Sequence, residues 1–270
     1  MLEQRIGLIG AGQMATALAR GFIKAGLTAA DRILAADVDD LARQRFTEAT
    51  AAPTTPDNAM VVDRSDLIFL AVKPQHIAGV AAGLRGKIGT QRLVVSIAAG
   101  IRLASLAKWF GQELRIVRVM PNTPCLVGQG VCAYSLGERA TPEDGVLVER
   151  LLASLGSAWQ VEEKLLDAVT GLAGSGPAFV YVIVEALSDA GVRVGLPRTM
   201  AAAMAAQTVR GAAEMVLATG EHPAVLKDRV ASPGGTTIAG LQMLESGGIR
   251  AALMAAVEAA ARRSAELGKD

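Results

Sequence analysis

The chain has 270 residues, of which 51% are hydrophobic and only 3% aromatic, and its formal net charge is +1. This length and apolar content suffice for one large or two medium domains. The balanced charge and the few aromatic side chains argue against nucleic-acid binding, because they provide neither a basic surface nor a stacking platform. The chain has two histidines and two cysteines, Cys125 and Cys132, and we expect both thiols to be free and buried. So few candidate ligands predict no metal site and no histidine-based triad.

The first predicted elements are a strand, a glycine turn and a helix. Apolar residues from Arg5 lead into Gly10-Ala11-Gly12-Gln13-Met14-Ala15, and a helical pattern follows. In this G-x-G-x-x-A motif the first glycine permits a tight turn, and the second lets a pyrophosphate approach the N-terminus of the helix. The motif therefore predicts a dinucleotide-binding fold.

A second strand at 33–36 ends at Asp37. An acidic side chain in this place commonly binds the ribose hydroxyls of the adenosine and would repel a 2'-phosphate, which favours NADH. Arg43 and Arg45 follow closely and would weaken that repulsion. The alternative interpretation is that Asp37 only caps the next helix.

Further apolar runs at 67–72, 93–97 and 115–119 alternate with helical spacers and predict a doubly wound parallel sheet. The backbone beyond Val72 would lie along the cofactor at the carboxyl edge of this sheet. Lys73 precedes a proline and is held extended, so we assign it no catalytic role. After the last of these strands, Asn122 either offers its amide to nicotinamide or substrate, or forms an Asx-turn.

The second half of the chain reads as helices, and we predict a Rossmann-like domain over 1–158 and an all-α domain over 159–270. Helical patterns cover 162–172, 178–191 and 198–217, and a shorter helix follows Glu221-His222-Pro223, where we expect His222 to be a capping or surface residue. Ser175, between two of these helices, either contacts cofactor or substrate or belongs to a simple glycine hinge. Alanine-rich helix faces predict a dimer interface, with an intramolecular core as the alternative.

The segment Ser232-Pro233-Gly234-Gly235-Thr236-Thr237 separates two helical patterns. Its glycines allow a tight turn whose N–H groups face an anion at the N-terminus of the next helix, which we expect from Ile238 onward. The alternative is an ordinary turn with a threonine cap. The sequence enters an apolar strand without a signal peptide, and we expect no apolar run long enough for a membrane span, hence a cytoplasmic protein.

Together these segments resemble the pyrroline-5-carboxylate reductase family over the whole chain. The resemblance is carried by the segments Ile9–Met14, Ala71–Gln75, Met120–Pro124, Gly174–Ala178 and, most specifically, Ser232–Thr237. It implies NAD(P)H-dependent reduction of the cyclic imine 1-pyrroline-5-carboxylate to L-proline. It also implies a homodimer with interleaved helical domains, an active site between the two halves of the chain, and in some members a ring of dimers.

The resemblance also implies roles for individual residues. Cofactor contacts would come from Gly10, Ala11, Gly12, Gln13, Met14, Asn58, Ala71, Val72, Lys73 and Pro74. The substrate carboxylate would bind to Ser232, Gly234, Gly235, Thr236 and Thr237, with Thr237 and Ser232 as the candidate catalytic residues and Glu221 near the substrate. Many members carry a small polar residue in place of Asp37, so the family favours NADPH where Asp37 favours NADH.

Two alternatives remain open beside the reductase. A 3-hydroxyacid dehydrogenase with the same layout needs a lysine and an asparagine four and seven residues after the second glycine of its helix start, where this chain has Val180 and Ile183. Alcohol oxidation needs a group that accepts a proton, and apolar side chains cannot do so. A non-catalytic NAD(P) sensor would leave the glycine-threonine segment at 232–237 without a purpose. Turnover of pyrroline-5-carboxylate separates these alternatives from the reductase.

Overall fold

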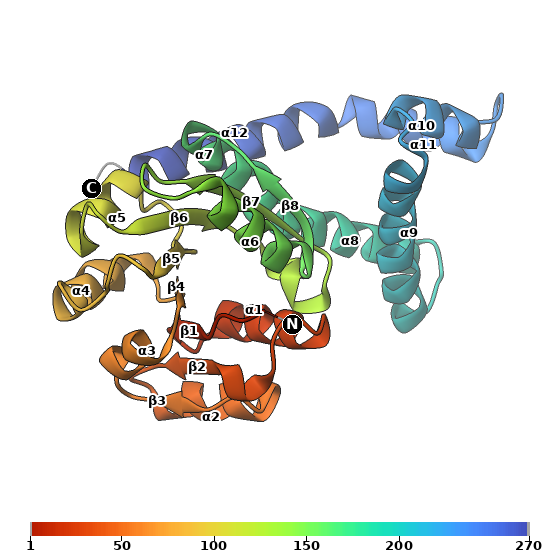
Figure 1. Cartoon of the computed structure of the whole chain (residues 1–270). Helices are drawn as coiled ribbons and strands as arrows, with labels where there is room; N and C mark the ends of the chain where they lie inside the picture. Colours follow the sequence, from red (N-terminus) through yellow and green to blue (C-terminus); the bar gives the residue numbers. More distant parts are fainter. Residues whose placement is uncertain (1, 269–270) are drawn as a thin grey trace. The chain divides into compact units, whose positions relative to one another are not determined.

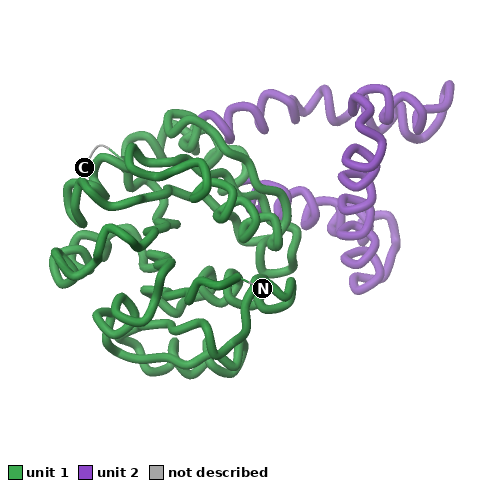
Figure 2. The backbone as a smooth tube through the Cα atoms, in the orientation of Figure 1, with its two compact units in different colours: residues 1–175, 259–270 green, residues 176–258 purple. Residues whose placement is uncertain are grey.

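The computed structural model describes residues 2–268 and divides into two compact units (Figure 2). Unit 1 comprises the chain up to Ser175 together with the segment from Ala259 onward, and unit 2 is Gly176–Glu258. The predicted boundary at 158/159 lies inside unit 1. The reason is that residues just beyond 158 complete the sheet and pack on it, so the chain leaves unit 1 only at Ser175.

One eight-stranded sheet forms the centre of unit 1, in the order β3-β2-β1-β4-β5-β6-β7-β8 (Figure 1). The predicted strands are β1 (Ile6–Ile9), β2 (Ile33–Ala36), β4 (Leu67–Leu70), β5 (Leu93–Ser96) and β6 (Arg115–Met120). All are parallel, and Ile9 is in register with both Ala36 and Leu70. Their carboxyl ends therefore meet at one edge, where α/β sheets bind ligands.

Three strands were not predicted from the sequence: β3 (Thr54–Thr55), β7 (Gly130–Leu136) and β8 (Gly156–Gln160). β7 runs antiparallel to β6, and β8 pairs parallel with β7, so the sheet is mixed at this end. The three share a weak apolar signal. β3 has two residues, β7 mixes small and polar side chains, and β8 is largely exposed, whereas the central strands are buried on both faces.

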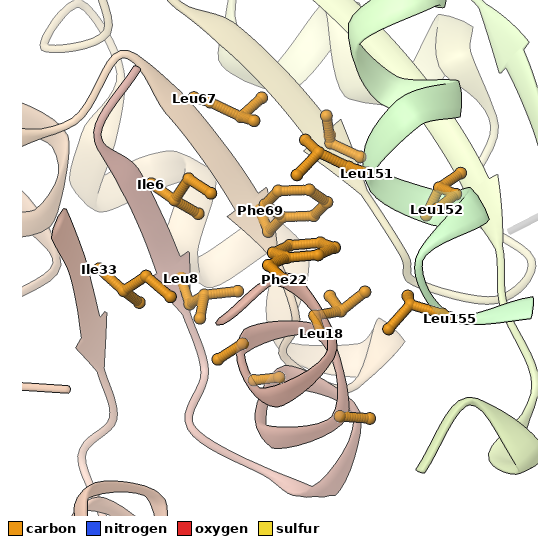
Figure 3. Close-up of a cluster of buried hydrophobic side chains, with 14 of the residues drawn as sticks. Ile6, Leu8, Leu18, Phe22, Ile33, Leu67, Phe69, Leu151, Leu152 and Leu155 are labelled. Atoms are coloured by element: carbon orange, nitrogen blue, oxygen red, sulfur yellow. The ribbon is translucent and has the colours of Figure 1, made fainter. Parts of the chain in front are cut away.

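Alternate residues of the central strands face two apolar clusters, one on each side of the sheet. On one side, α1 (Gln13–Lys24) and α6 (Pro142–Ala153) cover Ile6, Leu8 and Phe69 (Figure 3). Phe22 of α1 meets Phe69 with ring centroids 5.7 Å apart. Burial of such a side chain stabilises the fold by about 2–3 kcal/mol. This contact holds α1, and with it the glycine turn that precedes α1, against the sheet.

The other face of the sheet is covered by α3 (Asn58–Arg64), α4 (Pro74–Leu84) and α5 (Leu103–Phe110), which confirms the doubly wound arrangement. The remaining helical segments of this unit are α2 (Asp40–Thr50), α7 (Leu166–Val169), the 3-10 turns η1 (Ala30–Arg32), η2 (Thr123–Val127) and η3 (Glu163–Leu165), and the π-turn η4 (Thr170–Gly174). The predicted helix at 162–172 is thus three short pieces of different pitch.

Unit 2 is helical, as predicted. It contains α8 (Gly176–Arg193), α9 (Arg198–Thr219), α10 (Pro223–Val230), α11 (Thr236–Ser246) and the first part of α12 (Ile249–Leu267). α8 and α9 pack closely, since a Cβ on Gly191 would lie 3.0 Å from that of Ala201. The end of α12 belongs to unit 1, where the Ser264 hydroxyl donates to Asp167 Oδ1 at 2.7 Å.

The sequence predicts no apolar run long enough for a membrane span, and this expectation is corrected for one helical stretch. The helical stretch 163–193 is long and apolar enough, by length and composition, to cross a membrane. Residues 168–184 include glycine, serine and threonine but no charged residue, although no unbroken run of large apolar residues is present. In the single chain most of this window is exposed.

Candidate active site

The glycine turn between β1 and α1 fits the pyrophosphate of a dinucleotide. Gly10 has φ +103°, and a Cβ there would lie 2.7 Å from the carbonyl oxygen of Ala71, so only glycine is accommodated without strain. A Cβ on Gly12 would meet no atom within 4 Å, which leaves its backbone open to a ligand. Gly12 caps α1 without a side-chain hydrogen bond, so the first N–H groups of the helix face this open space.

A cavity of about 410 Å³ lies at this turn, at the carboxyl edge of the sheet. Its lining includes seven predicted cofactor residues: Gly10, Gly12, Asp37, Asn58, Ala71, Val72 and Lys73. The other predicted cofactor residues are outside the lining: Ala11, Gln13, Met14, Pro74 and Asn122. The cavity is also lined by residues that the sequence analysis missed: Ala36, Val38, His76 and Val80. His76 and Val80 were detectable, since they are four residues apart on the helix that Pro74 begins.

Asp37 connects the end of β2 to the glycine turn. Its Oδ2 accepts a hydrogen bond from the N–H of Ala11 at 2.8 Å, and Oδ1 accepts one from the N–H of Asp39 at 3.0 Å. The capping alternative is not what the structure shows, because Asp39 is the residue that caps α2. Each carboxylate oxygen retains acceptor capacity. Asp37 can therefore hold the turn in place and still accept from a ligand in the cavity.

Arg43 lies beside Asp37 but is already bonded. Its guanidinium donates to the Asp37 carbonyl at 2.6 Å and also pairs with the Asp40 carboxylate. The side chain is only 16% exposed. Asp40 already neutralises the guanidinium charge of Arg43. Arg43 therefore offsets the charge of Asp37 less than the sequence predicts.

Asn122 is placed differently from both of its predicted roles. Its Oδ1 accepts from the N–H of Val131 at 2.8 Å, and its Nδ2 donates to the carbonyl of Ala173 at 3.0 Å. Asn122 precedes η2 without making a side-chain cap bond, so no Asx-turn forms. The side chain is 7% exposed and does not line the cavity. Its amide thus joins backbone segments instead of facing a ligand.

The two thiols behind Asn122 are buried and free, as predicted, with Cys125 Sγ and Cys132 Sγ 3.6 Å apart. The hydrogen bond from Cys132 lowers the pKa of the Cys125 thiol to about 7, although burial opposes this shift. The same hydrogen bond and burial raise the pKa of Cys132. The directions of these two shifts favour ionisation of Cys125 before that of Cys132.

In unit 2, Ser232–Thr237 forms a tight turn that starts α11. The N–H of Gly235 donates to the carbonyl of Ser232 at 3.0 Å, and Gly234 has φ +65°, which is typical of a type II turn with proline at its second position. The helix begins at Thr236, two residues before the predicted start, and Gly235 caps it without a side-chain hydrogen bond. The threonine-cap alternative is therefore wrong, and the first N–H groups of α11 have no side-chain acceptor from the cap.

Glu221 and His222 directly precede α10. The Glu221 carboxylate forms a two-point ion pair with Arg229, with contacts of 2.6 and 3.0 Å, and the sequence analysis missed this partner. His222 Nδ1 accepts from the N–H of Ala224 at 3.2 Å, so His222 caps the helix, as predicted. Arg229 lies on α10, eight residues after Glu221, and it fixes the orientation of the carboxylate.

Comparison with known proteins adds to this geometry. Residues 163–267 match the family described as pyrroline-5-carboxylate reductase dimerisation, and residues 5–100 match the family described as NADP oxidoreductase coenzyme F420-dependent. Pyrroline-5-carboxylate reductase from Glycine max is 50% identical over 262 residues, which cover 97% of this chain and 95% of that protein. This chain belongs to the pyrroline-5-carboxylate reductase family. The family that the sequence motifs indicated is thereby confirmed.

Solved structures of pyrroline-5-carboxylate reductases share the fold over the full chain. The pyrroline carboxylate reductase from Plasmodium falciparum, a structure with NADP bound, has a TM-score of 0.90 and 34% identity, with 99% of each chain covered. The Coxiella burnetii pyrroline-5-carboxylate reductase has a TM-score of 0.92 and 35% identity, with both chains fully covered. The predicted class, a Rossmann-like unit followed by a helical one, is confirmed.

Proposed function

We propose that this protein transfers a hydride from a reduced nicotinamide dinucleotide to 1-pyrroline-5-carboxylate and so produces L-proline. The observation that carries the proposal is that the chain matches a pyrroline-5-carboxylate reductase at 50% identity over 97% of its length. The structure supports it with an open glycine turn at a cavity and a second glycine turn at the start of a helix. Both are suited to bind anions.

In unit 1 the cofactor would bind along the carboxyl edge of the sheet. The N–H groups around Gly12 would hold the pyrophosphate, and the backbone of Ala71 and Val72 would support the nicotinamide end. When bound, the reduced nicotinamide supplies the hydride. Asn58 and Lys73 also line this cavity and complete the cofactor contacts that we propose.

In unit 2 the turn at Ser232–Thr237 would bind the substrate carboxylate through backbone N–H groups. The hydroxyl of Thr237, in the first turn of α11, would contact the carboxylate or the ring nitrogen, and Ser232 would assist. Glu221, oriented by Arg229, would lie near the substrate. A protonated imine is already electron-poor. Holding its carbon against the nicotinamide would therefore provide most of the rate enhancement. A strong side-chain acid is not required.

We further propose that NADH is the preferred cofactor. Asp37 lines the cavity at the end of β2, so a 2'-phosphate bound there would meet its carboxylate. Arg43, which donates to the carbonyl of Asp37, is paired with Asp40. Repulsion between like charges disfavours NADPH under these conditions.

Ser175, which directly follows η4, is a further substrate contact that we propose.

The working form that we propose is a cytoplasmic homodimer whose helical parts interleave and which can assemble further into a ring of dimers. Large apolar side chains are exposed on the long helices of unit 2, for example Val182 at 64%, Met204 at 52% and Met254 at 73%. A monomer rarely leaves so much apolar surface in water. The match to a dimerisation family over 163–267 supports this interpretation, and free buried thiols suit a reducing compartment.

The reductase proposal is tested by following the oxidation of NADH and of NADPH after pyrroline-5-carboxylate is added to the purified protein. We expect turnover with at least one cofactor and formation of proline. Absence of turnover with both cofactors would contradict the proposal. Binding of the cofactor without turnover would favour the NAD(P) sensor instead.

A further inference from the structure

We infer that Asn122 is a positioning residue for hydride transfer. Its carboxamide would hold the π-turn η4, and thereby Ser175, in the arrangement that the reaction needs, without touching substrate or cofactor. This inference rests on the proposed reductase function, and it assigns to Asn122 a role other than the ligand contact expected from the sequence.

The first support is that both ends of the amide are used in a fixed direction. Oδ1 accepts from Val131 N at 2.8 Å, and Nδ2 donates to Ala173 O at 3.0 Å. The side chain is buried, where each unmade hydrogen bond is costly. A carboxamide accepts with one atom and donates with the other at every pH, whereas an ionised carboxylate of the same length can only accept. Asn122 therefore ties the end of β6 to the start of β7 and to η4.

The second support is that the Ala173 carbonyl needs an external donor. In a continuous α-helix it would accept from the N–H four residues later, but that residue is Pro177, which has no N–H. The chain forms a π-turn here, in which Ser175 N donates to Thr170 O at 2.8 Å. Such turns are frequent at functional sites. Asn122 supplies the hydrogen bond that the helix itself cannot supply to Ala173.

The third support is the close packing between the same two segments. A Cβ on Gly174 would lie 2.5 Å from Cε of Met120, so the π-turn rests directly on the end of β6. Ser175 follows at once, and its hydroxyl has no hydrogen-bond partner among the residues that the structure describes. β6 ends at the same sheet edge as β4, after which the proposed nicotinamide support, Ala71 and Val72, follows. The position of Ser175 at this edge thus depends on Asn122.

The test uses Asn122→Asp, which separates the two hydrogen bonds. A carboxylate still accepts from Val131 but faces the Ala173 carbonyl with negative charge, and a protonated carboxyl donates to it again. We expect kcat with saturating NADH to fall about tenfold at neutral pH, a loss that corresponds to about 1.4 kcal/mol. We expect the loss to be recovered as the pH falls through the carboxyl pKa. The Kd for NADH should stay within about twofold of wild type.

Two controls accompany this variant. Asp144→Asn removes a buried ion pair of 2.7 Å to Arg115, at the opposite end of β6, and should lower Tm while its kcat keeps the wild-type pH profile. The thiol of Cys125 lies 4.0 Å from Asn122 Oδ1 and is the titratable group that we identify beside the amide. Repeating the comparison in a Cys125→Ala background should leave the recovery at low pH unchanged.

The outcomes separate the two proposals. If the wild-type protein turns over pyrroline-5-carboxylate and Asn122→Asp has the same kcat at every pH, the inference is overturned alone. It is also overturned if kcat and NADH affinity fall together, as they would after general loss of structure. Absence of turnover in the wild-type protein refutes the reductase proposal, and the inference with it.

Discussion

Replacing Asp37 by serine should change the cofactor preference. The carboxylate lines the cavity at the end of β2 and is held by the N–H groups of Ala11 and Asp39 at 2.8 and 3.0 Å. Two unit charges 4 Å apart at a partly exposed site interact by about 4 kcal/mol at most, and salt reduces this value. A net change of about 1.4–2.7 kcal/mol corresponds to a rise of about 10- to 100-fold in the ratio of kcat/KM for NADPH to that for NADH.

The assay compares kcat/KM for both cofactors at low and at moderate ionic strength. Asp37→Asn serves as the matched variant, because it keeps the shape of the side chain and an acceptor for Ala11 while it removes the charge. If charge decides the preference, Asp37→Asn and Asp37→Ser should shift the ratio in the same direction, and salt should narrow the difference from wild type. Asp63→Asn, on the solvent side of α3, should change nothing.

A ratio that is unchanged in both variants would refute the argument that Asp37 selects NADH. An equal loss of activity with both cofactors would indicate the other role of Asp37, which is to hold the glycine turn through the N–H of Ala11. In that case specificity would have to come from other residues of the cavity.

Gly10→Ala should abolish measurable cofactor binding in calorimetry, because its Cβ would lie 2.7 Å from the Ala71 carbonyl and its φ is +103°; unchanged affinity would contradict the fit of the turn. Thr237→Ala should lower kcat about 10- to 100-fold while the Kd for the cofactor stays near wild type, and an equal loss of both would indicate misfolding instead. Burial and the hydrogen bond to Glu149 raise the pKa of Tyr134 to about 12, so its contribution to stability is complete below pH 10 and is lost as the pH rises from 10 to 12. Urea unfolding across that range should show a loss on the order of 2 kcal/mol that Tyr134→Phe lacks, and an identical loss in the variant would assign it to other groups.

The central sheet was predictable because its strands are continuous apolar runs buried on both faces. The glycine turn was also predictable, because the spacing of Gly10 and Gly12 reflects local backbone geometry. β7 and β8 escaped prediction because their side chains are small, polar or exposed, and pairing with a neighbouring strand decides their conformation.

Contacts between distant segments could not be predicted in this way. Asn122 bonds to Val131 and Ala173, which are 9 and 51 residues away along the chain, and no periodic pattern encodes such pairs. The ion pair of Glu221 with Arg229 was missed for a different reason. Each side chain, taken alone, is interpreted as an exposed charge without a partner assigned to it. His76 was accessible to sequence reasoning, since it lies on the helix that Pro74 begins, four residues before Val80, which also lines the cavity.

The reductase activity and the NADH preference are tested most directly by the rate of NADH oxidation by the purified wild-type protein with pyrroline-5-carboxylate, together with quantification of proline. We expect saturable turnover, one proline formed per NADH consumed, and a higher kcat/KM with NADH than with NADPH. Tight cofactor binding with no oxidation of either cofactor would contradict it.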